Sequence, residues 1–417
     1  MDLVLILTII GVIATIIFGI PGYISVYYAK KEHDKKNQTS VILEAQTDDP
    51  FYDRFTRAID QLGSEKTEIR LGAISALEII ANKSDEYYWR IMENLTAYIR
   101  RNSSIEDQRL KEQGKVQFDI QAILSVIKKC NKPDDFIEPC GLDLQDTYLC
   151  KANLSEALLE RVNLQGANLK ETNFTKAHLE GADLYGADLT GADLTEAHLE
   201  GANLKGANFK GANLKKADLE GADFIEMDLE EHYIVKKANF EDAKLEGAHL
   251  KEAYLAEVNL KKANFEGADL EEANFEGANL TEANLEGANL KRAFFGREPY
   301  FYLGGANLTK ARLGGADLTG ASFEGANIKE ADFEGATLEG ADFTEVDFEE
   351  DDIDDSLFPV LYKHNLTIDQ LYKVKSLYGA KNLNHELEAS LRKNHPRLFE
   401  ETDDHKWYRE NFIQFKS

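Results

Sequence analysis

The chain has 417 residues, of which 43% are hydrophobic, so it can bury several cores and form more than one domain. Its formal net charge is −27, and −24 of this lies between residues 142 and 353. Such acidity disfavours nucleic acid as a direct ligand, since phosphates are bound by lysine and arginine. It leaves solubility, or a basic protein partner, as the reason for the charge.

The N-terminal stretch Leu3–Ala29 contains no charged side chain. It is long enough to cross a hydrocarbon core of about 30 Å as a helix. A cleavable signal peptide would have a basic start and a shorter apolar run, whereas this chain begins with an acidic Asp2. Four lysines follow between residues 30 and 36, and the positive-inside rule places them in the cytoplasm. We therefore predict that residues 1–29 form a single transmembrane helix in an inner membrane, with the N-terminus outside and the bulk of the chain cytoplasmic.

Residues 30–48 are polar and predict a linker, and residues 49–130 predict a small α-helical domain. Four segments each place apolar side chains on one helical face: Phe51, Phe55, Ala58, Ile59 and Leu62; Leu71, Ile74, Leu77 and Ile80; Ile91, Leu95, Tyr98 and Ile99; Ile120, Ile123, Leu124 and Ile127. They fit either a small bundle or a pair of helical-repeat hairpins. Residues 131–141 then form a connector to the next domain.

From Leu142 to Ile353 the sequence repeats a five-residue unit close to Ala-(Asp/Asn)-(Leu/Phe)-x-(Gly/Ala). A period of five fits neither a helix, with a period of 3.6, nor a half-buried strand, with a period of 2. It predicts a solenoid in which the central apolar residue and the small residue two positions earlier point inward. The central residues fall into three runs in register, Leu144–Ile234, Phe240–Phe295 and Leu303–Ile353.

This repeat resembles the pentapeptide-repeat family. The resemblance implies a mainly β fold, a right-handed quadrilateral β-helix with four units per coil and roughly ten coils over residues 142–355. The helical stretch EIRLGAISALEIIA, together with YYWRIMENLTAYIRR and DIQAILSVI, also resembles the module found ahead of the coil in membrane-anchored bacterial members of this family.

Two interruptions break the register. Around Tyr233–Lys237 the phase shifts by one residue, which predicts a bulge at a corner of the coil. Between Phe295 and Leu303 the spacing is eight rather than five, so the segment GREPYFY should protrude. This loop carries three adjacent aromatic residues, Tyr300, Phe301 and Tyr302. They either form a binding hot spot or fold back onto the flank of the rod.

Four units per coil predict that outward residues 20 positions apart form columns along the rod. One column consists of glutamates: Glu160, Glu180, Glu200, Glu220 and, allowing for one inserted residue, Glu241. Adjacent carboxylates about 5 Å apart repel each other by somewhat under 1 kcal/mol in water. His178 and His198 should stack beside this glutamate column and offset part of its charge.

The glutamate column is the surface that we expect to bind a basic protein patch or loosely held cations. A solvated acidic face without a partner is the alternative. By contrast, Lys251, Glu271 and Lys291 alternate in sign on what the sequence predicts to be another column. That alternation is expected for stability alone.

After Ile353 the period stops, and helix signals replace it. Thr367 and Gln370 have the spacing of a capping box, Asn384 can cap a second helix, and Pro396 lies just beyond it. Residues 356–400 therefore predict a helical cap over the last coil, whose open end would otherwise expose unpaired backbone groups. Residues 401–417 predict a tail.

Motifs for catalysis are absent from the sequence, with no P-loop, G-x-S-x-G, H-E-x-x-H or dinucleotide fingerprint. Cys130, Cys140 and Cys150 lack C-x-x-C spacing and fit reduced thiols. The nine histidines show no metal-ligand spacing with cysteines or carboxylates along the chain. We therefore predict no enzyme activity, no cofactor and no metal.

The expected function is a membrane-tethered interaction scaffold that presents its acidic rod to an unknown protein partner, with homo-oligomerisation left open. One alternative comes from the resemblance, because some pentapeptide-repeat proteins have acidic rods that mimic duplex DNA and bind DNA gyrase. The charge favours this alternative, whereas the anchor and the helical modules at both ends oppose it. A further alternative is a membrane effector in bacterial stress or phage defence, although residues 3–29 lack the polar face of a pore.

Overall fold

The structure, a computed structural model, describes residues 49–129, 142–228, 233–297, 304–344, 368–383 and 385–400. The chain divides into two compact units, the first Met1–Ile91 with Lys132–Cys140 and the second Met92–Asn131 with Gly141–Ser417. Each unit is described by itself.

The first unit contains α3 (Tyr52–Leu62), α4 (Thr67–Lys83) and the start of α5 (Asp85–Asn102). Helices α3 and α4 bury the apolar faces that the sequence indicates, with Leu62, Leu77 and Ile80 among the buried side chains. The Tyr87 hydroxyl donates to the Asp49 carboxylate, which lies just before α3.

The second unit begins with the remainder of α5, followed by α6 (Gln108–Gln113) and α7 (Phe118–Lys129). Helix α6 has no counterpart among the four segments expected from the sequence. These helices contact the first coils through polar groups: Gln121 accepts a hydrogen bond from the amide of Asn153 at 2.8 Å, and Lys128 Nζ donates to Ser155 Oγ at 2.9 Å. Elements on the N-terminal side therefore cover that end of the coil.

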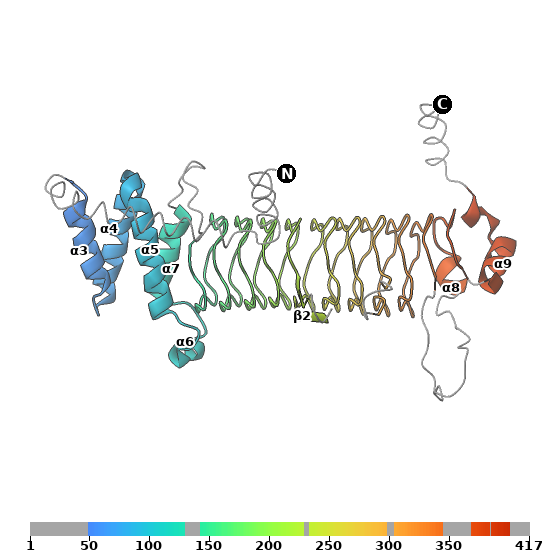
Figure 1. Cartoon of the computed structure of the whole chain (residues 1–417), viewed down its shortest axis with the longest axis horizontal. Helices are drawn as coiled ribbons and strands as arrows, with labels where there is room; N and C mark the ends of the chain where they lie inside the picture. Colours follow the sequence, from blue (N-terminus) through green and yellow to red (C-terminus); the bar gives the residue numbers. More distant parts are fainter. Residues whose placement is uncertain are drawn as a thin grey trace, which may run out of the picture. The chain divides into compact units, whose positions relative to one another are not determined.

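The repeats form a stack of flattened coils, drawn from green to orange in Figure 1. Parallel bridges join residues 20 positions apart, as Asp183 to Asn203, so each coil holds four five-residue units. Nearly every alanine and central leucine or phenylalanine in the described repeats is fully buried. Aromatic rings stack along this core, with centroids 4.6 Å apart for Phe209 and Phe240 and 5.0 Å for Phe295 and Phe323. The core is thus a column of small and large apolar side chains.

Each unit ends in a bend that uses the left-handed region of the backbone. The bend residue has φ of +63° at Gly181 and +56° at Glu196. Glycine adopts this conformation without steric cost, which explains why it is frequent at the fifth position of the repeat.

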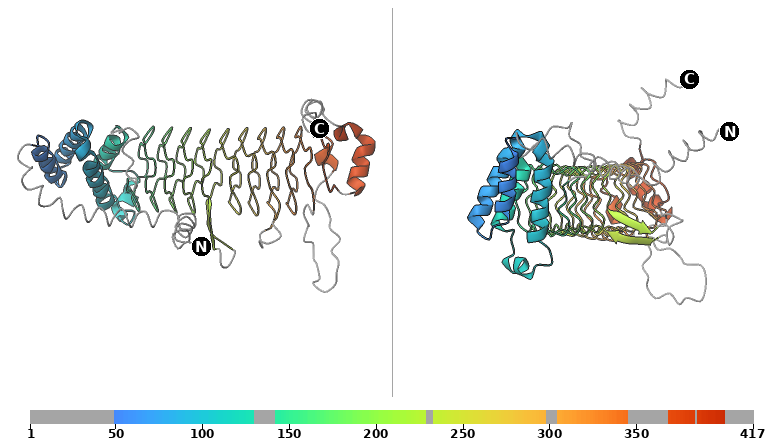
Figure 2. Two further views of the ribbon diagram at one scale, coloured as in Figure 1. Left: turned by 45° about the horizontal axis from the view of Figure 1, so that its top comes forward. Right: turned by 60° about the vertical axis from the view of Figure 1, so that its left-hand side comes forward.

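The first interruption is larger than one residue. Asn208 pairs with Asn239, 31 positions on, so eleven residues leave the coil. They include part of an antiparallel hairpin made of β1 (Ile225–Asp228) and β2 (Tyr233–Lys237). Figure 2 shows these two strands beside the stack. The predicted one-residue bulge is therefore wrong.

The second interruption is also longer than expected. Asn279 pairs with Asn307, 28 positions on, so eight residues leave the coil rather than three. The next inward leucine is Leu308, which is fully buried, and Leu303 lies outside the described residues.

The parallel ladder continues beyond the last repeats. Thr337 pairs with Ser376, and Asp342 pairs with Lys381, 39 positions on in both cases. The chain therefore leaves the coil a third time and then returns to add one more set of parallel bridges, here called the final rung. Around this rung lie α8 (Ile368–Leu371), α9 (His385–Asn394) and the 3₁₀ helix η1 (Pro396–Phe399). The Leu377 amide donates to the Leu398 carbonyl at 2.6 Å, which connects the rung to η1.

The expected location in an inner membrane needs correction. None of the helices in the described ranges is both long and apolar enough to cross a bilayer. The stretch Leu3–Ala29, on which that prediction rested, lies outside the described residues.

Candidate functional site

Four glutamates of the predicted column lie one above another on the outside of the coil. Successive coils are joined here by backbone hydrogen bonds of 2.8–2.9 Å, from Arg161 N to Glu180 O, from Gly181 N to Glu200 O and from Gly201 N to Glu220 O. The residue two positions earlier in each unit forms its own bridged column, Leu158, His178, His198 and Asp218. The structure thus brings Glu160, Glu180, Glu200 and Glu220 together, as the 20-residue period predicts.

Glu241 does not belong to this column. The Gly211 amide donates to the Glu241 carbonyl, and Lys210 Nζ lies 2.9 Å from Glu241 Oε2. This hydrogen bond from Lys210 holds the pKa of the Glu241 carboxyl below its usual value and raises the pKa of Lys210. The prediction fails because the hairpin removes eleven residues from the count rather than one. From here on the glutamate column means the four glutamates from Glu160 to Glu220.

The same column continues with alternating charge. Asp218 is bridged to His249, which places Lys251 after Glu220, and Glu271 and Lys291 follow at 20-residue intervals. The expectation that these residues form another column is therefore wrong. Lys251 Nζ lies 4.0 Å from Glu271 Oε1, and Arg292 also pairs with Glu271. Only the first four coils of this column present glutamates in succession.

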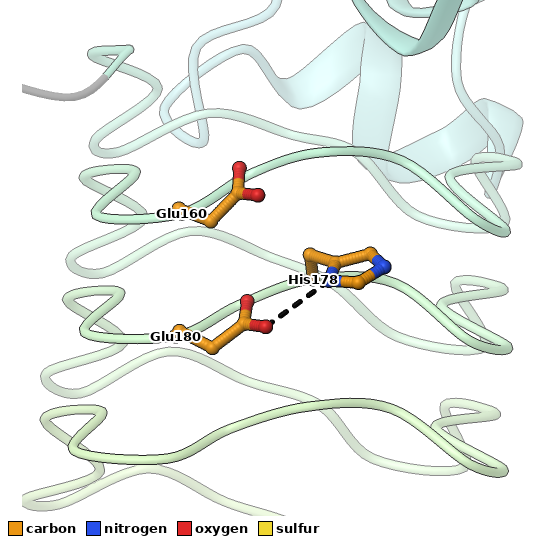
Figure 3. Close-up of side chains that lie close together, drawn as sticks. All are labelled: Glu160, His178 and Glu180. Atoms are coloured by element: carbon orange, nitrogen blue, oxygen red, sulfur yellow. Dashed lines mark hydrogen bonds and ion pairs between the residues drawn. The ribbon is translucent and has the colours of Figure 1, made fainter. Parts of the chain in front are cut away.

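Two histidines partner these glutamates. His178 Nδ1 lies 3.0 Å from Glu180 Oε1, as Figure 3 shows, and His198 Nδ1 lies 3.4 Å from Glu200 Oε1. The two imidazole rings stack with centroids 4.8 Å apart and an interplanar angle of 10°. Within the described ranges, no lysine or arginine forms an ion pair with the glutamate column.

The histidines and glutamates form two overlapping groups of metal-ligand type. Glu160, His178 and Glu180 offer ligand atoms that all lie within 4.8 Å of one another, and Glu180, His198 and Glu200 do the same one coil further on. Figure 3 shows the first group, with Glu160 and Glu180 on successive coils beside His178. Glu180 is common to both groups.

The sequence prediction that the histidines lack carboxylates at metal-ligand spacing does not hold for these two groups. Spacing along the chain shows only the pairs two positions apart, whereas the coil adds a third ligand that lies eighteen and twenty positions away. The signal was present as the triplet His-Leu-Glu, which occurs at 178–180 and again at 198–200.

Elsewhere on the surface, opposite charges alternate along the rod. One such column, here named the Lys–Glu column, lies eleven residues, about half a coil, from the glutamate column. Its ion pairs join Lys151 to Glu171, Lys262 to Glu282 and Lys310 to Glu330 at 3.6–3.7 Å. The glutamate column therefore differs from a column built for charge balance. The second predicted surface, Tyr300, Phe301 and Tyr302, lies outside the described residues.

This geometry defines a class of protein, a four-sided β-helical solenoid whose polar side chains form columns on its outer faces. The family profile for pentapeptide repeats matches the chain in eight copies, at residues 152–191, 192–230, 236–271, 259–297 and 306–345. The chain belongs to the pentapeptide-repeat family, and the β-helix is of its right-handed type.

Solved structures of the same family resemble parts of the chain. HetL, a pentapeptide repeat protein involved in heterocyst differentiation regulation in the cyanobacterium Nostoc, is 34% identical over 48% of this chain and 84% of its own, with a TM-score of 0.37. A pentapeptide repeat protein from the thylakoid lumen of Arabidopsis thaliana is 29% identical over 33% of this chain and 70% of its own, with a TM-score of 0.19. QnrB1, a plasmid-mediated fluoroquinolone resistance protein, is 17% identical over 45% of this chain and 81% of its own, with a TM-score of 0.26. No curated protein is similar enough to the chain to count as a match.

Proposed function

We propose that this protein is a non-enzymatic interaction scaffold and that its glutamate column binds a basic patch of a partner protein. Pentapeptide-repeat proteins generally serve as structural or interaction proteins, which supports the class of function. The observation that carries the proposal is the run of four stacked glutamates without a lysine or arginine partner among the described residues. Further along the same column, lysines alternate with the acids.

The column is suited to recognition rather than to stability. Stacked carboxylates repel each other, and the chain relieves this repulsion elsewhere by placing lysine one coil away from glutamate. A partner that supplies lysines or arginines would remove the repulsion on binding, so its attraction would be strongest at low salt. Nucleic acid carries the same sign of charge and is not expected to bind directly.

Charge reversal tests this function. Partners are captured by crosslinking from cells that express the full chain, and the affinity of an identified partner is then measured with purified protein. We expect Glu180→Lys, Glu200→Lys and Glu220→Lys together to weaken binding by tenfold or more, which corresponds to about 1.4 kcal/mol.

The Lys–Glu column supplies a matched control. Glu171→Lys, Glu282→Lys and Glu330→Lys change the net charge by the same amount, and the ion pairs that they break are exposed and contribute little to stability. This control should bind the partner with nearly unchanged affinity. Equal loss in both triple variants would mean that net charge, not the glutamate column, drives binding. The mimicry alternative predicts that duplex DNA displaces the protein from its partner, because the acidic rod would then occupy the partner's DNA-binding surface.

A further inference from the structure

Beyond the proposed binding of a protein, we propose that the glutamate column carries a binding site for a divalent transition-metal ion of the Zn²⁺ type. The first site consists of Glu160, His178 and Glu180. The second repeats it one coil further on with Glu180, His198 and Glu200. Both groups come from the rigid ladder of the coil rather than from a loop.

The distances fit coordination after small side-chain rotations. In tetrahedral zinc sites, ligand atoms lie about 2.0–2.2 Å from the metal, so neighbouring ligand atoms are roughly 3.3–3.6 Å apart. His178 Nδ1 and Glu180 Oε1 are 3.0 Å apart, and His198 Nδ1 and Glu200 Oε1 are 3.4 Å apart. The third ligand atom of each group lies within 4.8 Å of the other two. Three protein ligands would leave at least one position for water.

Two carboxylate oxygens supply a second, independent observation. Glu180 Oε2 and Glu200 Oε2 are buried, yet neither has a hydrogen-bond partner in the part of the chain that the structure describes. An unsatisfied buried oxygen is unfavourable, and more so when it carries charge. A metal ion bound to these carboxylates would bring positive charge next to the unsatisfied oxygens. About a third of each glutamate side chain remains exposed, so an ion can enter from solvent.

The ligand set selects the class of ion. One imidazole nitrogen with two carboxylates suits Zn²⁺ and related first-row ions, whereas Ca²⁺ and Mg²⁺ prefer oxygen ligands throughout. Each group contributes two carboxylates, so one divalent ion would neutralise it. The two groups share Glu180, so a second ion would be repelled by the first and would bind more weakly.

The same column contains a natural contrast. His249 follows Asp218 in the ladder. The residue two positions after His249 is Lys251, whereas His178 and His198 are each followed two positions later by a glutamate. A cationic neighbour disfavours a second cation. His249 should therefore contribute nothing to metal binding, which makes its replacement the matched control for the other two histidines.

Titration of the metal-free full chain with Zn²⁺ by calorimetry tests the proposal. We expect one ion to bind with micromolar affinity, and a second to bind more weakly. Replacing both His178 and His198 by alanine should weaken the tighter site by tenfold or more, and His249→Ala should leave it within twofold of the wild type. The same titration with Mg²⁺ should show no comparable binding. If Mg²⁺ bound as tightly as Zn²⁺, the assignment of ligand chemistry would be contradicted.

X-ray absorption of the Zn²⁺-loaded wild type gives a readout that does not depend on the folding of a variant. The account predicts nitrogen and oxygen ligands near 2.0–2.2 Å with scattering from at least one imidazole. No Zn²⁺ binding, equal binding by the double-histidine variant, or a spectrum without imidazole would overturn the proposal. If the partner still binds when a chelator removes the metal, the scaffold function does not depend on the metal site. The two proposals can therefore fail separately.

Discussion

At the scale of single residues, the bend at the fifth repeat position places the backbone in the left-handed region, which strains any residue other than glycine. Some units accept this strain with Glu or Lys, as at Glu196, whereas others avoid it with glycine, as at Gly186, where φ is +65°. The cost of a β-carbon in the left-handed region is about 1–2 kcal/mol. The choice of residue at this position therefore adjusts the stability of each coil without changing its shape.

Gly186→Ala should destabilise the coil by about 1 kcal/mol, because the left-handed backbone disfavours a β-carbon. A β-carbon at Gly186 meets no atom within 4 Å, so no clash contributes. The same substitution at Gly72, within helix α4 and equally open, should instead stabilise its helix by about 0.8–1 kcal/mol. Denaturant unfolding followed by circular dichroism measures both. A shift of the same sign in both variants would contradict the account.

At the scale of elements, the repeat period predicts the inward residues well and the excursions poorly. The hairpin escaped detection because Leu229 and Ile234 continue the five-residue spacing from Phe224. Their residues at minus two are Met227 and His232, which are too large for the small inward position. The repeat also requires a small residue two positions before the central apolar residue. The absence of that small residue was the sequence signal that these residues leave the coil.

The same reasoning applies to the second excursion. Leu303 fits an apolar spacing, but its residue at minus two is Phe301, whereas Leu308 has Ala306. Ala306 is fully buried, and its amide donates to the Phe295 carbonyl at 2.7 Å, where the coil resumes. The metal-ligand geometry of the candidate site also required the coil, since side chains such as Glu160 and His178 become neighbours only after the register is known.

Deletion of residues 227–237 tests the register of the hairpin. Removing these eleven residues joins Glu226 to Ala238, whose amide already donates to the Phe224 carbonyl at 2.8 Å as in an uninterrupted repeat. We expect this variant to keep its circular dichroism spectrum and to melt within a few degrees of the wild type. Deleting only residues 228–237 leaves one residue out of phase and should lower the melting temperature clearly. Equal melting temperatures of the two deletion variants would contradict this register, because a coil with a one-residue bulge would keep that bulge in the ten-residue deletion.

At the scale of the whole molecule, most of the acidic charge lies on the repeats, and its distribution matters more than its total. The Lys–Glu column balances its charges in pairs, whereas the glutamate column relies on two histidines. A rigid coil holds these groups at fixed spacing, so a ligand meets a preorganised row of carboxylates and loses little free energy to ordering. This arrangement supports both the proposed protein partner and the proposed metal ion.

Carboxylate labelling of the free and partner-bound protein, read by mass spectrometry, tests the central claim most directly. The account predicts that the partner protects the glutamate column from labelling and leaves Glu171, Glu282 and Glu330 of the Lys–Glu column as reactive as before. Unchanged labelling of Glu180, Glu200 and Glu220 in a saturated complex would contradict it, because the partner would then bind another surface.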